Sequence, residues 1–174
     1  MKNIYLLVGP SGAGKTTIAR ELDERFGLKE IWSYTERPPR YPGEPGHIYV
    51  TPEEFDALGN LSGYTLYNGY RYGVPEYVVD ASDVYVIDPA GVRYMKEHYH
   101  GCKGVVVIGI EARDNAERMR QRGDTESMIA ARLKTDFTEF SALKDMADVL
   151  FKNDDLDRTV RAIYAYICVM EEEE

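Results

Sequence analysis

The feature that most constrains this chain is a glycine-rich segment that directly follows a short apolar run. Residues 4–8 read Ile-Tyr-Leu-Leu-Val, and residues 9–16 read Gly-Pro-Ser-Gly-Ala-Gly-Lys-Thr. This is the G-x-x-x-x-G-K-[ST] pattern between a buried strand and a helix, the arrangement of a phosphate-binding loop. The glycines let successive N–H groups face one anion, and the helix adds the positive end of its dipole. The segment therefore predicts binding of a nucleoside triphosphate.

Two side chains of this loop carry specific chemistry. Lys15 supplies a mobile positive charge for the terminal phosphates, and the hydroxyl of Thr16 is placed to bind Mg2+. A plain connector between strand and helix is the alternative, and the Lys-Thr pair at the required spacing argues against it. The residues expected to contact ATP are Gly9, Pro10, Ser11, Gly12, Ala13, Gly14, Lys15, Thr16 and Thr17.

The overall charge limits the partners. The formal net charge is −9 at pH 7, whereas nucleic acid and anionic membranes both require a basic face. Arginines nevertheless gather in short segments, such as residues 37–40 and 118–122, so we expect a locally positive cleft. No apolar run reaches the length of a membrane span, and the N-terminus lacks the pattern of a signal peptide. A cytoplasmic protein without a nucleic-acid or membrane partner is expected.

Apolar runs alternate with helical patterns along most of the chain, which predicts an α/β fold with a parallel sheet. The expected strands are 3–8, 83–88 and 104–110, and the last of these is uninterruptedly apolar, as in a strand covered on both faces. The expected helices are 14–26, 90–99, 112–121, 125–144 and 155–168. Residues 171–174, four glutamates, are interpreted as a frayed, solvated end.

The stretch from about 34 to 80 breaks this alternation. It is rich in Pro, Gly and Tyr and holds short strand-like pieces at 47–50, 64–67 and 70–73. A short strand is also expected just before it, at 30–32. Thr51 and Glu54 form a capping-box pattern, which predicts the start of a helix. We expect this stretch to be a small inserted subdomain.

A second motif lies at the start of the insert. Residues 33–40 read Ser-Tyr-Thr-Glu-Arg-Pro-Pro-Arg, and two arginines three residues apart suit a bidentate grip on a phosphate. Tyr49 and Tyr72 could add hydroxyl donors. A solvated basic turn beside structural aromatic residues is the alternative.

With these motifs in place, the chain resembles the guanylate kinase family over nearly its whole length. The resemblance implies a P-loop NTPase fold: a parallel β-sheet core (about 1–33 and 81–174) flanked by helices, an inserted NMP-binding subdomain (about 34–80) and a lid (about 113–127). The landmarks are the loop at 9–17, Ser33-x-Thr35-x-Arg37-x-Pro39-Arg40, Gly43-Glu44-x-Gly46-x-x-Tyr49, Glu54-Phe55, Tyr72-Gly73, Asp88-x-x-Gly91, Arg118-x-x-x-Arg122-Gly123, Arg132-Leu133 and Asn153-Asp154-Asp155-Leu156.

The same resemblance implies roles for single residues. Arg118 and Arg122 would close over ATP, Arg132 would reach the transferring phosphoryl group, and Asn153 would lie beside the adenine. The acceptor phosphate would be held by Arg37, Arg40, Tyr49 and Tyr72, and the acceptor base would lie near Ser33 and Asp88.

The chemistry of such a transfer needs fixed cations rather than a general base, because the acceptor oxygen belongs to an ionised phosphate. The catalytic residues would accordingly be Lys15, Arg37, Arg122 and Arg132, with Mg2+ brought by ATP. Asp88 ends an apolar run and would help arrange Mg2+ through water, with a plain cap as the alternative. The three histidines, His47, His98 and His100, are poor catalytic candidates.

The match to the family fails at three positions that would read the base. Counting back from Tyr72-Gly73, a guanine-reading glutamate of the family corresponds to Gly63, and a Ser or Thr corresponds to Val74. The first aspartate of an Asp-x-Asp pair corresponds to Val86. The residues that handle phosphate are kept, whereas several that read guanine are not.

Three functions are consistent with these observations. The first is ATP-dependent phosphorylation of a nucleoside monophosphate, GMP or dGMP above all, by a monomer or homodimer. The second is a kinase of the same fold that acts on another nucleotide or a sugar phosphate. The third is a non-catalytic binding module, which the intact phosphate loop argues against.

Overall fold

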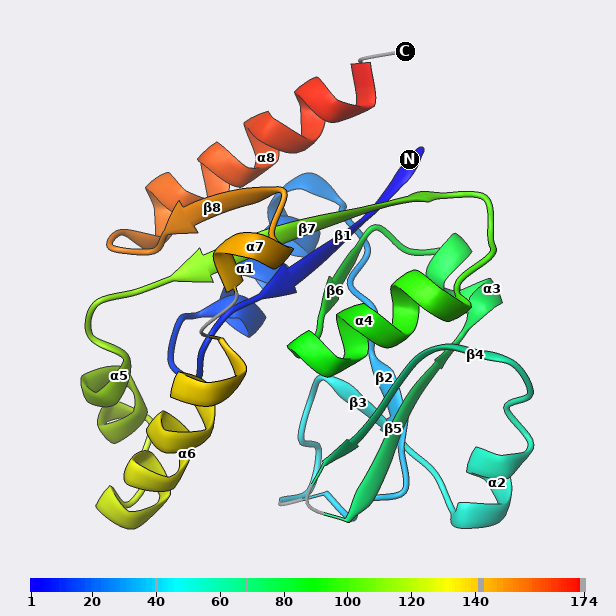
Figure 1. Ribbon diagram of the computed structural model, residues 1–174, viewed down its shortest axis with the longest axis horizontal. Coiled ribbons are helices and arrows are strands. Elements are labelled where there is room, and N and C mark those ends of the chain that lie inside the picture. The colour runs from blue at the N-terminus through cyan, green and yellow to red at the C-terminus, as the bar shows by residue number, and fades with distance from the viewer. Residues whose placement is uncertain (40, 68, 141–142, 173–174) are drawn as a thin grey trace.

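The protein is described here by a computed structural model that covers residues 1–39, 41–67, 69–140 and 143–172. Its central sheet is parallel and consists of β1 (Asn3–Val8), β6 (Val84–Val86), β7 (Gly104–Glu111) and β8 (Val149–Lys152), in the order β6-β1-β7-β8 (Figure 1). The α/β fold with a parallel sheet is therefore confirmed.

The alternation of side chains along β1 explains why helices cover both faces of this sheet. Tyr5 and Leu7 point to one face, where α1 (Lys15–Phe26) and α8 (Leu156–Glu172) pack through residues such as Leu22 and Ile163. Ile4, Leu6 and Val8 point to the other face, which α4 (Pro89–His98) and α7 (Leu143–Met146) cover. Because both faces are buried, the central strands read as apolar runs.

A second, mixed sheet is built from the Pro- and Tyr-rich stretch. It contains β2 (Ser33–Thr35), β3 (His47–Tyr49), β4 (Leu61–Tyr67) and β5 (Tyr70–Pro75), in the order β3-β2-β5-β4. The pair β2 and β3 is parallel, whereas β5 runs antiparallel to both β2 and β4. Two short helices accompany it, α2 (Pro52–Asp56) and α3 (Glu76–Asp80), and α2 begins with the predicted capping box.

Two further helices complete the arrangement around the phosphate loop. These are α5 (Asn115–Gln121) and α6 (Glu126–Glu139), which follow the carboxyl end of β7. In Figure 1 they lie on one side of that end of the central sheet, and the second sheet lies on the other. The loop between β1 and α1 thus stands between two flanking elements.

Some predicted elements are wrong in detail. The helix expected over 125–144 ends at Glu139, and residues 141–142 lie outside the described part of the chain. The strand expected at 30–32 begins instead at Ser33, and Glu30 makes only an isolated bridge to Val84. Strand β8 was not predicted, because an edge strand of four residues with partly exposed side chains gives a weak apolar signal.

The interpretation of residues 171–174 as a frayed end is wrong for Glu171. This residue belongs to α8, and its carboxylate accepts hydrogen bonds from the backbone N–H of Lys2 (2.6 Å) and from the hydroxyl of Tyr5 (2.8 Å). Residues 173 and 174 lie outside the described residues. Within the described chain, no helix is both long enough and apolar enough to cross a bilayer.

Candidate active site

The phosphate loop has the backbone geometry that its glycines predict. Gly12 and Gly14 adopt positive φ angles of 78° and 93°, which side-chain-bearing residues rarely do. A Cβ on Gly14 would also lie only 2.4 Å from the amide nitrogen of Asn153. Gly14 directly precedes α1 and has no side chain that caps the helix. The first N–H groups of α1 are thus free of a side-chain cap and available to an anion.

A cavity of about 490 Å³, here called the loop cavity, opens in front of this loop. Its walls come from the loop, the first turn of α1, α5 and the residue that follows it, the middle of α6, and the segment after β8. None of the described residues that line it is acidic, and four are cationic, so it is suited to a polyanion. The lining residues are Ser11, Gly12, Gly14, Lys15, Thr16, Thr17, Arg118, Arg122, Arg132, Asn153 and Leu156.

Arg118 and Asn153, both predicted to bind ATP, lie together at one edge of the loop cavity. The Asn153 amide donates a hydrogen bond to the carbonyl of Ala13 (2.8 Å), and the Arg118 guanidinium donates to the carbonyl of Asn153 (2.5 Å). Asn153 is buried. These two bonds connect the phosphate loop, α5 and the segment after β8, so they join three of the walls of the loop cavity.

Asp124 is a component of this site that the sequence reasoning missed. Its carboxylate forms an ion pair with Arg122 (2.6 Å) and lies 3.9 Å from Arg132. It thereby holds together two cations, one directly after α5 and one within α6. Asp124 directly follows Arg122 and Gly123 in the sequence. An acidic residue within this basic segment could have indicated an ion pair with the arginines.

Lys15 points back toward the loop. Its ammonium group donates hydrogen bonds to the carbonyls of Gly9 and Pro10, the second at 3.0 Å. The pKa of Lys15 is lowered to about 8, chiefly because the group is buried; Arg122 and Arg132 contribute to this lowering, while the nearby carboxylate of Asp136 opposes it. The ammonium thus stands in an environment that an additional anion would stabilise.

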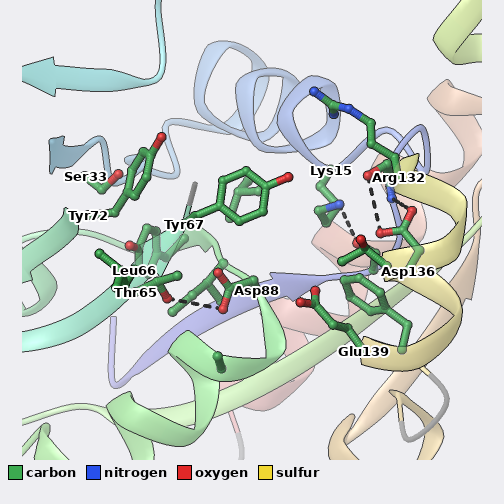
Figure 2. A pocket seen from close by; sticks show the side chains of 18 of the residues that line it. Lys15, Ser33, Thr65, Leu66, Tyr67, Tyr72, Asp88, Arg132, Asp136 and Glu139 are labelled. Atoms are coloured by element: carbon green, nitrogen blue, oxygen red, sulfur yellow. Dashed lines mark hydrogen bonds between the residues drawn. The ribbon is translucent and has the colours of Figure 1, made fainter. Parts of the chain in front are cut away.

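A second cavity of about 350 Å³, here called the sheet cavity, lies between the second sheet and α6. Figure 2 shows Ser33, Thr65, Leu66, Tyr67 and Tyr72 on one side, Lys15 and Arg132 on the other, and Asp88 between them. The lining residues are Gly9, Ser11, Lys15, Ser33, His47, Thr65, Leu66, Tyr67, Tyr72, Tyr85, Val86, Ile87, Asp88, Ala90, Arg132, Thr135, Asp136, Glu139 and Phe140.

The two cavities meet at three residues. Ser11, Lys15 and Arg132 line both of them. Two ligands bound side by side would therefore share the Lys15 ammonium and the Arg132 guanidinium at their junction. This is the arrangement required for a group transfer between two anions, because the cations can stabilise the charge of the group that moves.

The structure brings together only part of the predicted acceptor site. Ser33, Tyr72 and Asp88 line the sheet cavity, whereas Arg37 and Tyr49 are not among its lining residues. The side chain of Arg37 is buried, with its two terminal nitrogens 2.9 and 3.2 Å from the carboxylate oxygens of Glu44 and one of them 3.3 Å from the hydroxyl of Tyr49. Arg37 thus has a protein carboxylate as its partner.

Hydrogen bonding with Glu44 raises the pKa of Arg37 above its ordinary value, although burial opposes this. The guanidinium is therefore fixed in its charged form and in its orientation. Arg40, predicted to hold the acceptor phosphate beside Arg37, lies outside the described residues.

Asp88 acts as a helix cap in this structure. Its carboxylate accepts hydrogen bonds from the backbone N–H of Gly91 (2.6 Å) and the hydroxyl of Thr65 (3.2 Å). The first bond caps α4, and the second connects the central sheet to β4 of the second sheet. Asp88 therefore caps α4, which was the alternative role expected from the sequence, and its role in arranging Mg2+ stays a prediction.

Other residues of the sheet cavity were missed by the sequence reasoning. His47, Thr65 and Tyr85 come from strands whose pairing depends on the tertiary fold, and no local pattern indicated them. Asp136 and Glu139 follow Arg132 on α6 at spacings of four and seven residues, so one helical face carries all three. That spacing was a usable signal.

The central sheet, the phosphate loop and the two joined cavities define a kinase of the phosphate-loop class. No family model matches the chain. It is similar to curated guanylate kinases: 31% identical over 92% of the chain to that of Thermosynechococcus vestitus (90% of its length), and 34% over 94% to that of Gloeobacter violaceus (85% of its length). The chain belongs to the guanylate kinase family.

Solved structures agree with this assignment. The guanylate kinase of Anaplasma phagocytophilum superposes with a TM-score of 0.70 at 27% identity, covering 98% of this chain and 87% of that one. A sugar kinase from Janibacter sp. HTCC2649 superposes with a TM-score of 0.59 at 17% identity, covering 96% and 95%. The second likeness shows the fold alone.

Proposed function

We propose that this protein transfers the γ-phosphoryl group of Mg-ATP to the phosphate of a nucleoside monophosphate, with GMP and dGMP as the first candidates. The proposal rests on the observation that the loop cavity and the sheet cavity meet at Lys15 and Arg132. ATP would occupy the loop cavity and the monophosphate the sheet cavity. Similarity to guanylate kinases supports this assignment.

In the proposed reaction, an oxygen of the acceptor phosphate attacks the γ-phosphorus, and the bond to the β,γ-bridging oxygen breaks to release ADP. The acceptor oxygen is ionised near neutral pH, so no general base is required. Lys15, Arg122 and Arg132 would stabilise the charge on the transferring group, and Arg118 and Asn153 would border the bound ATP. Arg37, Arg40, Tyr49 and Tyr72 would contribute to holding the acceptor phosphate.

The residues present fit a magnesium ion that arrives with ATP. The Thr16 side chain is exposed at the start of α1, beside the loop cavity. Within the part of the chain that the structure describes, no group of three or more His, Cys, Asp or Glu residues could hold a metal. An Mg2+ ion here would take its oxygens from phosphates, water and the Thr16 hydroxyl, with Asp88 acting through water. The ion would neutralise phosphate charge during the transfer.

We further propose that residues 34–80 form the acceptor-binding subdomain and residues 113–127 a lid. The lid would bring Arg118 and Arg122 over ATP and exclude water, which protects ATP from hydrolysis. A cytoplasmic monomer or homodimer is proposed.

The proposal is tested by measuring ADP release with GMP, dGMP, AMP, CMP, UMP and dTMP as acceptors. We expect turnover with at least one of them. Absence of turnover with all six, by folded protein that binds Mg-ATP, would overturn the proposal. Absence of Mg-ATP binding would instead favour a non-catalytic binding module.

A sugar phosphate acceptor is the second candidate, and a specific observation favours it. The described residues of the second sheet that line the sheet cavity include no carboxylate, lysine or arginine. A wall without carboxylate, lysine or arginine side chains suits the hydroxyl groups of a sugar. Ribose phosphates added to the same assay separate this candidate from the first.

A further inference from the structure

The wall of the sheet cavity opposite Lys15 is built from neutral hydrogen-bonding groups. Ser33, Thr65, Tyr67 and Tyr72 lie there (Figure 2). The carboxylate of Asp88 lies between this wall and Lys15 and is engaged by Thr65. Asp136 and Glu139 come from α6 on the far side. A ligand whose distal part contacts the wall therefore meets hydroxyl groups and aromatic rings.

Ser33 connects the wall to two further residues that line the sheet cavity, His47 and Tyr85. The Nδ1 atom of His47 lies 2.9 Å from the Ser33 hydroxyl, and the Ser33 side chain also interacts with the Tyr85 hydroxyl. The parallel register of β2 and β3 places Ser33 directly beside His47. Burial raises the pKa of Tyr85, so its phenol stays neutral over the physiological range. The chain His47–Ser33–Tyr85 can pair with hydroxyl or carbonyl oxygens.

Gly63 stands directly against Tyr85. A Cβ built on Gly63 would lie 3.3 Å from a ring carbon of Tyr85, 3.7 Å from its hydroxyl oxygen and 3.7 Å from the Cβ of Val74. The backbone of Gly63 is not left-handed, so residues with side chains can adopt it. A side chain at position 63 would thus enter the space beside the Tyr85 ring. The Tyr85 ring occupies the space that a longer side chain at position 63 of β4 would need.

These contacts bear on how a base would be recognised. Guanine differs from the other bases in presenting the N1–H and N2–H donors side by side, and a carboxylate accepts both as charge-assisted bonds. Hydroxyl and imidazole groups pair about equally with several bases, and also with ribose hydroxyls. The described residues of the second sheet that line the sheet cavity include no carboxylate, so this wall loses most of this basis for discrimination.

We propose that Gly63 and Tyr85 set the acceptor specificity of this protein, such that it accepts a phosphorylated ribosyl group with little discrimination among bases. This inference rests on the proposed function. It assigns Tyr85 and His47 to acceptor binding and identifies the ligand by its phosphate and hydroxyl groups.

The first test compares kcat/KM for GMP, AMP, CMP, UMP and ribose 5-phosphate at saturating Mg-ATP. We expect the four nucleotides to fall within about tenfold of one another. We also expect turnover of ribose 5-phosphate, because the proposal identifies the ligand by its phosphate and hydroxyl groups. Absence of this turnover would contradict that part of the proposal. A preference for GMP well beyond tenfold over the other nucleotides would overturn the proposal.

The second test introduces a carboxylate on β4, beside Tyr85. In the double variant Gly63→Glu/Tyr85→Leu, the smaller leucine makes room for the new side chain. We expect the ratio of kcat/KM for GMP over AMP to rise at least about tenfold. The matched control is Gly63→Gln/Tyr85→Leu, which has the same shape without the charge and should leave the ratio unchanged. An unchanged ratio in the glutamate variant, with Mg-ATP affinity retained, contradicts the proposal.

One further variant and one further measurement cover the cases in which the double variants or the assay fail. If the double variants do not fold, the variant Tyr85→Phe is used, because it removes only the hydroxyl. We expect it to raise KM for all acceptors by a similar factor, and a change confined to GMP would contradict the inference. If the wild-type protein turns over no acceptor, the proposed function fails on its own. Calorimetric affinities for GMP and AMP, measured on wild type and both double variants, then decide the inference without catalysis.

Discussion

The carboxylate of Asp136 accepts a hydrogen bond from the backbone N–H of Ser11, with an N···O distance of 2.9 Å. Asp136 belongs to α6, and Ser11 belongs to the phosphate loop, so this bond docks the helix against the loop through an anionic group. The Ser11 hydroxyl adds a weaker contact of 3.4 Å to the same carboxylate. A side-chain anion thus already uses one N–H group of a loop that we expect to bind phosphate.

The Ser11–Asp136 contact predicts tighter binding of Mg-ATP when the charge of Asp136 is removed. In Asp136→Asn, the new amide no longer repels the terminal phosphate, and a unit charge a few ångströms away contributes on the order of 1 kcal/mol even with strong screening. We expect the Kd for Mg-ATP to fall about fivefold by calorimetry. The control is Asp145→Asn, which alters an exposed acid on α7. Weaker binding by Asp136→Asn would show that the carboxylate supports the bound state.

The depressed pKa of Lys15 predicts proton uptake on ATP binding. Without ligand, burial lowers this pKa from 10.5 to about 8, and a triphosphate beside the ammonium favours the charged form and raises it again. At about pH 9, the free protein is mostly neutral at Lys15 and the complex is protonated, so binding takes up close to one proton. Affinity should therefore decrease as the pH rises above the pKa of the free protein.

Calorimetry in buffers of different ionisation enthalpy measures this uptake. Lys15→Ala should show none, and it should lose phosphoryl transfer while keeping its fold, as judged by circular dichroism. Retained activity in that variant would refute the role assigned to Lys15, and the same heat in all buffers would refute the proton uptake by wild type.

The buried ion pair of Arg37 and Glu44 predicts a large loss of stability when one partner is neutralised. Both side chains are less than a tenth exposed, at 9% and 7%. Glu44→Gln leaves the guanidinium without its counter-charge, and breaking a buried pair in this way costs about 3 kcal/mol or more. We expect this loss in the free energy of unfolding by urea. Adding Arg37→Met to Glu44→Gln should recover part of it, because the unpaired charge is then gone.

A matched surface pair provides the comparison. Arg120 and Glu126 are bonded at 2.6 Å but are exposed, so Glu126→Gln should leave the unfolding midpoint nearly unchanged. A loss for Glu44→Gln as small as that for Glu126→Gln would mean that the Arg37–Glu44 pair is solvated in solution.

The Glu171 carboxylate predicts an acid-sensitive contribution to stability. Burial alone would raise its pKa, but hydrogen bonds from Lys2, Tyr5 and Asn3 outweigh this and lower it below the ordinary value. A group with a lowered folded pKa stabilises the protein above its unfolded pKa, and this stabilisation is lost as the pH falls through the folded pKa. We expect Glu171→Gln to be less stable than wild type at neutral pH by about 1 kcal/mol.

The difference between Glu171→Gln and wild type should shrink as the pH falls through the lowered folded pKa of Glu171, because both side chains are then neutral. Thermal melts across this pH range measure it. The neighbouring Glu172 is exposed, so Glu172→Gln serves as the control and should follow the wild-type curve. A constant difference between Glu171→Gln and wild type at all pH values would mean that the charge of Glu171 is irrelevant.

Much of the fold could be predicted because its signals are local. The apolar run before Gly9 and the glycine spacing predicted β1, the loop and α1, whose observed bounds differ from the prediction by one residue at most. The Thr51–Glu54 capping box was read from three-residue spacing and is present. Strand β8 was missed because its pattern is short, and Glu171 was misread because its partners, Lys2 and Tyr5, are at the other end of the chain.

The sequence by itself determined the phosphate loop, because the motif depends on spacing within a few residues, and the parallel sheet, because strand and helix patterns alternate along the chain. The resemblance to a family, carried by motifs in the sequence, indicated the arginines around the loop cavity. The tertiary structure alone decided which side chains meet across elements. It placed Asp136 on Ser11, paired Arg37 with Glu44, and set Gly63 against Tyr85. Such contacts depend on strand register and helix docking, which join residues far apart in the chain and leave no periodic trace in the sequence.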